Sequence, residues 1–212
     1  AAVADNMCLF SIAEDTGGSI RQPASFCGVV GFRPSYGRNS RYGIMPMASS
    51  LDVVGPMAKT VEDIAIVSEV MAGTDERDAT TYPDAVPACS AQLETNLSGL
   101  KIGLPKEYFE LDGIDEQVKE TVLAAVEQYK AAGAEVVEVS LPHTKYAIPT
   151  YYIIVPSEDS SNLARLDTIR YGNQVEADNL YDMYAKGRAA GFPAEVKRRI
   201  MIGTYALSAG YY

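Results

Sequence analysis

The hydrophobic pattern of this 212-residue chain changes character several times along its length. Residues 7–12 are a short apolar run with strand-like character, and residues 28–36 resemble a short strand and a turn. Residues 38–55 are rich in Ser, Gly, Met and Pro, which predicts an extended loop or an edge segment. From Thr60, apolar residues recur with helical spacing until Gly73, and Thr60 with Asp63 is close to a capping box.

A strand–helix–strand pattern follows a long polar stretch. Residues 74–98 carry charges and prolines with little periodicity, and predict a surface excursion. Residues 100–104 and 134–141 have strand patterns, with a helical pattern between them that ends at Gly133. This order predicts parallel pairing of the two strands and an α/β fold. Residues 150–155 are apolar enough to be buried, and the rest of the chain is mostly helical with a break at 191–193.

The length supports one domain with a full hydrophobic core, so we expect residues 1–212 to form a single domain. The first residue is not Met, and the sequence begins with Ala1-Ala2-Val3-Ala4 and ends with an apolar run. Natural termini are usually polar. We therefore expect an internal piece of a longer chain, incomplete at both ends.

Composition narrows the possible partners and cofactors. The net charge is −10 and the pI is about 4.6, which is poorly suited to holding a nucleic-acid backbone directly. Cys8, Cys27 and Cys89 have no metal-ligand spacing and only one histidine is present, so a zinc site is not expected. The apolar neighbours of the cysteines predict buried, reduced thiols of a cytoplasmic protein. The sequence contains no membrane-spanning apolar run.

Residues 15–25 carry the clearest chemical signal. Gly17 and Gly18 precede Ser19, so successive backbone N–H groups can point into one concavity that binds an anion. Such a nest also stabilises the oxyanion of acyl transfer. A serine at its rim is placed to attack the carbonyl that the nest polarises.

Residues 15–25 also allow three other interpretations. A phosphate-binding loop needs a lysine after the glycines, and none follows. A Ser-His-Asp hydrolase needs Gly-x-Ser-x-Gly spacing and a histidine, but His143 follows Leu141-Pro142, where a surface or capping residue is expected. The third interpretation is a tight turn without chemistry, and the residues alone leave it as open as catalysis.

Several segments resemble the amidase signature family. Residues 15–24 are similar to the core of its signature, residues 27–38 continue it in register, and residues 49–56 match a further segment. The C-terminal half resembles one branch in particular, the A subunits of glutamyl-tRNA(Gln) amidotransferases, through residues 160–165, 170–172, 195–200 and 203–212. The resemblance implies the α/β amidase-signature fold, a mixed β-sheet core flanked by helices.

The resemblance also implies roles for individual residues. Ser19 is the expected nucleophile, and the N–H groups of Thr16, Gly17, Gly18 and Ser19 are the expected oxyanion hole. Arg199 matches an arginine that binds the carboxylate of glutamine, although a solvated charge beside Lys197 and Arg198 is the simpler alternative. Tyr151 or Tyr152 matches a tyrosine that contacts substrate. The family's base, a second serine relayed by a lysine, matches positions upstream of Ala1.

By the same resemblance, the expected function is a glutaminase whose ammonia is used by a partner subunit to convert Glu-tRNA(Gln) to Gln-tRNA(Gln). ATP and Mg²⁺ are expected to serve that partner, and tRNA to bind mainly through it, with no cofactor in this chain. The isolated chain is expected to be inactive. The alternatives are a stand-alone amidase and an inactive fragment. Glu14 departs from the family pattern, and its charge either weakens oxyanion binding or points to solvent.

Overall fold

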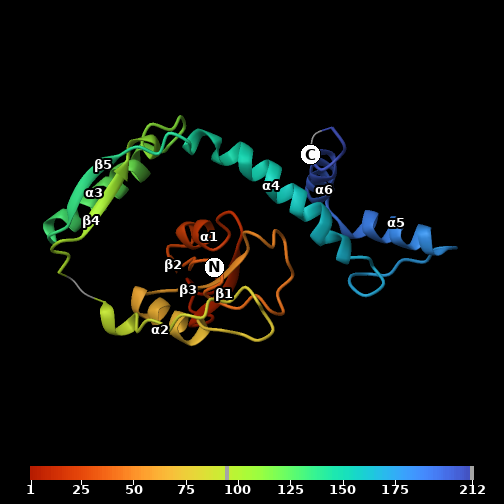
Figure 1. Ribbon diagram of the computed structural model, residues 1–212, viewed down its shortest axis with the longest axis horizontal. Helices are drawn as coiled ribbons and strands as arrows, with labels where there is room; N and C mark the ends of the chain where they lie inside the picture. Colours follow the sequence, from red (N-terminus) through yellow and green to blue (C-terminus); the bar gives the residue numbers. More distant parts are fainter. Residues whose placement is uncertain (94–95, 211–212) are drawn as a thin grey trace. The chain divides into compact units, whose positions relative to one another are not determined.

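The computed structural model describes residues 1–93 and 96–210 (Figure 1). Its contacts divide the chain into two compact units, Ala1–Ala91 with Thr150–Tyr212 and Gln92–Pro149. The expectation of a single domain over residues 1–212 stays a prediction. Two expected segments, 74–98 and 203–212, run partly outside the described residues.

A three-stranded antiparallel sheet forms the centre of the first unit. Its strands are β1 (Phe10–Asp15), β2 (Val30–Gly31) and β3 (Val53–Ala58), in the order β1-β3-β2. β1 pairs with β3 from Phe10 opposite Ala58 to Asp15 opposite Val53. The helices α1 (Arg21–Phe26) and α2 (Val61–Met71) contact this sheet. The small core contains mainly Ile20, Ala24, Ala48, Val53, Val54, Ala58, Ile64 and Ala65.

The sequence located α2 and β2 correctly, placed β1 slightly too early, and missed the central strand β3. Thr60 caps α2, because its side chain accepts a hydrogen bond from the Asp63 N–H at 3.0 Å, as the near capping box predicted. β1 begins three residues later than the apolar run at 7–12 and continues to Asp15. β3 occupies the end of the expected loop 38–55, where alternation is hidden because both faces of the strand are buried.

Three longer helices complete the first unit: α4 (Ala147–Asn162), α5 (Leu180–Gly191) and α6 (Ala194–Ala206). A 3₁₀ turn, Leu163–Arg165, directly follows α4. The expected break falls between α5 and α6, at Phe192 and Pro193. Only part of the apolar run 150–155 is buried, because it is helical: Val155 is enclosed, whereas residues 152–154 are exposed.

The second unit has the predicted strand–helix–strand arrangement. β4 (Lys101–Pro105) and β5 (Glu135–Val139) pair in parallel, with Lys101 opposite Glu135, and α3 (Glu116–Ala131) connects them and contacts β5. Short 3₁₀ turns are formed by Ser90–Gln92 at the end of the first unit and by Lys106–Tyr108 and Thr144–Tyr146 in this one. The parallel pairing confirms the sequence-based prediction.

The expectation of buried cysteines was wrong. Cys8 is exposed, Cys27 and Cys89 are half-buried, and all three are free thiols. The expectation rested on apolar neighbours, but Leu9 and Phe26 are themselves exposed, and Cys8 precedes β1. In the part of the chain that the structure describes, no helix is long and apolar enough to span a membrane.

The crossing of α6 over α4 yields a first prediction. A Cβ added at Gly203 would overlap the backbone carbonyl of Pro156, so Gly203→Ala should lower the free energy of unfolding by about 1–3 kcal/mol. The control is Gly191→Ala, because the space beside that glycine is open and alanine favours the helix. Urea denaturation measures the free energy of unfolding of both variants. Equal stability of the two variants would contradict the close crossing.

Candidate functional site

The loop that carries Ser19 is organised by the carboxylate of Asp15. Asp15 is the last residue of β1, and its side chain is 0% exposed. Its Oδ1 accepts the Gly18 N–H at 2.7 Å, and its Oδ2 accepts the Ile20 N–H at 3.2 Å. The carboxylate therefore makes the loop curl around it, and Ser19 lies between the two anchored residues.

Two arginines neutralise this buried charge. Arg21 donates to Asp15 through Nε at 3.0 Å and Nη2 at 3.2 Å, and Arg33 donates to Oδ1 at 2.9 Å. Arg33 also reaches the Asp15 carbonyl at 2.7 Å and the Leu51 carbonyl at 2.9 Å. Burial alone would raise the pKa of the Asp15 carboxyl, but the hydrogen bonds from Arg21 and Arg33 outweigh it and hold the pKa well below its usual range.

The two glycines of the loop are required for different reasons. Gly18 has a φ of 138°, which side chains other than hydrogen rarely allow. Gly17 has an ordinary φ, but a Cβ there would lie 2.5 Å from Cε2 of Tyr151. The Tyr151 ring thus packs directly against the loop, and only glycine leaves room for it.

Thr16 connects the loop to a second signature segment. Its hydroxyl donates to Oδ1 of Asp52 at 2.6 Å, and the Asp52 carboxylate also accepts the N–H groups of Met47 and Ala48, each at 3.0 Å. Asp52 is fully buried. Segments 15–24 and 49–56, which the sequence analysis matched separately, are therefore joined by one hydrogen-bond network.

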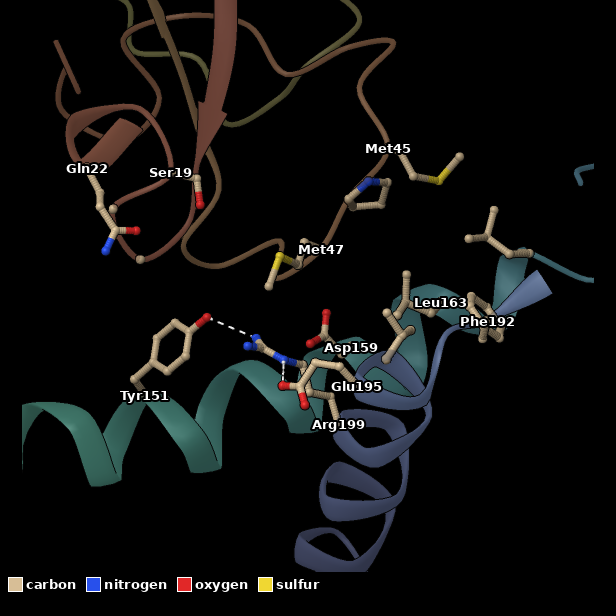
Figure 2. A pocket seen from close by; sticks show the side chains of 15 residues that line it. Ser19, Gln22, Met45, Met47, Tyr151, Asp159, Leu163, Phe192, Glu195 and Arg199 are labelled. Atoms are coloured by element: carbon tan, nitrogen blue, oxygen red, sulfur yellow. Dashed lines mark hydrogen bonds and ion pairs between the residues drawn. The ribbon is translucent and has the colours of Figure 1, made fainter. Parts of the chain in front are cut away.

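Ser19 is exposed and faces a cavity of about 700 Å³ (Figure 2). Among the described residues, nothing hydrogen-bonds to its hydroxyl or accepts the N–H groups of Gly17 and Ser19. The Gly18 N–H differs, because it already donates to Asp15. Of the four expected oxyanion-hole donors, Gly17 and Ser19 thus have N–H groups free to bind an anion, whereas Thr16 is buried.

Arg199 and Tyr151 lie on the opposite side of the same cavity. Arg199 donates to the Tyr151 hydroxyl at 3.1 Å and to Glu195 at 3.0 Å. These hydrogen bonds, Tyr151 first, raise the pKa of the guanidinium. The Arg199 side chain is 22% exposed, against 55% for Arg198, so Arg199 is not simply a solvated helix charge. Tyr151 lines the cavity; the ring of Tyr152 lies beside Arg199, 6.0 Å from its guanidinium carbon, outside the lining.

Two carboxyl groups have raised pKa values: Asp159, which no sequence pattern singled out, and Glu14, which departs from the family pattern. Asp159 lines the wall from α4, and burial raises its pKa to about 6. Glu14 is half-buried, with its pKa raised to about 7 by burial and by the charge of Asp52. Glu14 therefore turns towards Asp52, which neither sequence-based alternative anticipated. His143 is exposed and does not line the cavity.

The Asp15 network yields a second prediction. Asp15→Asn replaces one buried carboxylate oxygen by an NH₂ group, which cannot accept hydrogen bonds from the N–H groups around it. The substitution should lower the free energy of unfolding by about 3–5 kcal/mol at pH 7. Because the carboxyl pKa is depressed in the folded state, the difference from wild type should shrink as the pH falls below about 4. Denaturant titrations measure this, with the exposed Asp5→Asn as control. Equal effects at the two sites would contradict the anchoring role.

Curated relatives resemble the chain from end to end. The A subunit of the glutamyl-tRNA(Gln) amidotransferase of Fusobacterium nucleatum is 59% identical over 213 residues, and its counterpart from Parvibaculum lavamentivorans is 57% identical over 212. Both matches cover 100% of this chain, but only 44% and 43% of the relatives. The chain thus spans less than half the length of these proteins.

Solved structures show the same fold. The A subunit of the glutamyl-tRNA(Gln) amidotransferase of Thermotoga maritima superposes with a TM-score of 0.74 at 44% identity, covering 100% of this chain and 41% of that one. The peptide amidase of Stenotrophomonas maltophilia superposes with a TM-score of 0.77 at 31% identity, covering 99% and 43%. The predicted α/β amidase-signature fold is therefore confirmed.

The family model for amidases matches residues 1–212, the full length of the sequence. The match includes the loop shaped by Asp15, Ser19 at its rim and the wall that carries Arg199. This chain belongs to the amidase family.

Proposed function

We propose that the cavity beside Ser19 hydrolyses the side-chain amide of glutamine, and that the ammonia released is used by partner subunits to convert Glu-tRNA(Gln) to Gln-tRNA(Gln). The observation that carries the proposal is the arrangement of an unpartnered serine hydroxyl and a half-buried arginine around one cavity. The similarity to A subunits of glutamyl-tRNA(Gln) amidotransferases supports the choice of substrate and partners. ATP and Mg²⁺ would act at the partner, in an aqueous cytoplasmic assembly.

Ser19 would act as the nucleophile. Its Oγ attacks the amide carbon of the glutamine side chain, and the oxyanion that forms accepts hydrogen bonds from the free N–H groups of Gly17 and Ser19. The C–N bond breaks and ammonia leaves with a proton from the base. Water then attacks the acyl-enzyme ester, which releases glutamate and restores the hydroxyl.

The base would come from outside these 212 residues. Among the described residues that line the cavity, none is a histidine or a lysine. The family resemblance assigns the base to a second serine that a lysine activates, at positions upstream of Ala1. The 212 residues alone should therefore release little ammonia, since an unactivated hydroxyl is a poor nucleophile at neutral pH.

Arg199 would hold the α-carboxylate of the substrate. A guanidinium offers two parallel N–H donors to a carboxylate, and the contacts with Tyr151 and Glu195 fix its plane before substrate binds. The main alternative is an amidase acting on another amide, which the likeness to a peptide amidase favours. The glutaminase requires a substrate with a free α-carboxylate in addition to the amide, whereas the general amidase does not.

The nucleophile is tested by Ser19→Ala in the natively expressed protein with its co-purifying subunits. Ammonia release from glutamine should fall by about 10³-fold or more, because no covalent intermediate can form. Ser25→Ala is the matched control, an exposed serine six residues away whose side chain has no role in the cavity. Retained activity in Ser19→Ala would refute the assignment.

The carboxylate contact is tested by Arg199→Lys, compared with Arg198→Lys on the same turn of α6. Arg199→Lys should raise KM for glutamine by about 10- to 100-fold, since a bidentate charged contact is lost. It should leave hydrolysis of butyramide, which has no carboxylate, nearly unchanged. Equal losses on both amides would instead indicate that Arg199 only supports the structure, and a wild type that prefers butyramide would favour the general amidase.

A further inference from the structure

Gln22 is a polar side chain of the cavity, three residues after Ser19, that the steps described so far do not use. It is exposed and lines the cavity. No hydrogen bond or ion pair joins its carboxamide to another described residue. Figure 2 shows Gln22 and Ser19 on the side of the cavity formed by the loop that carries Ser19, with Tyr151 and Arg199 across from them.

The backbone holds Gln22 at a fixed place relative to Ser19. The Gln22 N–H donates to the Gly18 carbonyl at 2.8 Å, which closes one helical turn around Ser19. The preceding residue, Arg21, is paired with the buried Asp15 carboxylate. Side chains three positions apart on such a turn are neighbours, with Cβ atoms about 5–6 Å apart. The Gln22 carboxamide can therefore reach an amide group that lies against the Ser19 hydroxyl.

A primary amide needs hydrogen-bond acceptors as well as donors when it enters this cavity. Its carbonyl oxygen is served by the free N–H groups of Gly17 and Ser19. Its NH₂ group carries two further donors, which lose water on binding and cost free energy if they find no acceptor. An ester has no such donors. An acceptor beside Ser19 therefore favours amides over esters.

Gln22 provides an acceptor on the side of the cavity where the reaction occurs. Apart from Ser19 itself, the other side chains of the described lining that carry oxygen are on α4 and α6: Tyr151, Asp159 and Glu195. The Gln22 carbonyl is uncharged, so it accepts a hydrogen bond without opposing the negative charge that develops on the oxyanion.

We propose that Gln22 is a specificity-determining residue that accepts a hydrogen bond from the NH₂ group of the scissile amide, so that the site selects primary amides over esters of the same acid. The inference rests on the proposed function and extends it from the nucleophile to recognition of the leaving group. Because the N–H donors belong to the leaving group, the contact forms before the C–N bond breaks and is lost with the ammonia.

The test compares glutamine with the γ-methyl ester of glutamate, which keeps the reacting carbonyl but has no N–H group at the scissile bond. In the natively expressed protein with its co-purifying subunits, Gln22→Met should lower the ratio of kcat/KM for glutamine to kcat/KM for the ester by about 10-fold, since a side chain of similar size lacks the carbonyl. Gln22→Glu keeps an acceptor and should preserve the ratio, even where both rates fall.

The matched control is Gln128→Met, which changes an exposed glutamine of α3 and should leave both rates unchanged. Thermal unfolding verifies that each variant is folded. An unchanged ratio in Gln22→Met would show that Gln22 is only a solvated side chain. Equal losses on the amide and the ester would place Gln22 at the oxyanion or in a structural role. Either result would overturn the inference.

Binding to the Ser19→Ala protein separates this inference from the proposed function. Calorimetry should show tighter binding of glutamine than of the ester, and Gln22→Met in the same background should reduce that difference by about 10-fold. Glutamine that binds with this preference but is never hydrolysed by the wild type would refute the glutaminase and leave the inference intact. Equal binding of the two ligands, binding of neither, or a difference that survives Gln22→Met would overturn the inference even if hydrolysis occurs.

Discussion

The geometry of this site depends on one buried negative charge. The Asp15 carboxylate accepts hydrogen bonds from the backbone of the nucleophile loop and from two arginines, with no exposure to solvent. A carboxylate in that position is stable only if every partner stays in place, since an unpaired buried charge is expensive. The loop conformation that exposes Ser19 is therefore set by the same contacts that stabilise the first unit.

The opposite wall of the cavity is attached to this loop through α4. Asn162 donates to the Met47 carbonyl at 2.9 Å, and Glu158 holds the backbone of Ser50. Met47 is also anchored by Asp52, which binds Thr16 in the nucleophile loop. A continuous path of hydrogen bonds thus connects the loop that carries Ser19 to α4. The hydrogen bond between Tyr151 and Arg199 then connects α4 to α6. Such a path fixes the distance between reacting and recognition groups before substrate enters.

Sequence reasoning succeeded where a local rule was enough. The Thr60 cap, the parallel pairing of β4 and β5, and the break before α6 follow from short-range patterns. The glycine pair also indicated where a serine could be exposed. The role of Asp15 depends on Arg33, 18 positions away, and no local pattern reveals such a contact.

Other features of the site were unpredictable for the same reason. The choice between Tyr151 and Tyr152 depends on which ring packs against Gly17. The position of Asp159 in the cavity wall depends on segments that are far apart in the sequence, although its spacing with Val155 and Asn162 indicates a buried helix face.

The most direct measurement of the central claim is peptide mapping by mass spectrometry after inactivation with a diazoketone analogue of glutamine. A single covalent adduct on Ser19 is expected, because the loop held by Asp15 presents that hydroxyl to the cavity; inactivation with the adduct on any other side chain would contradict it.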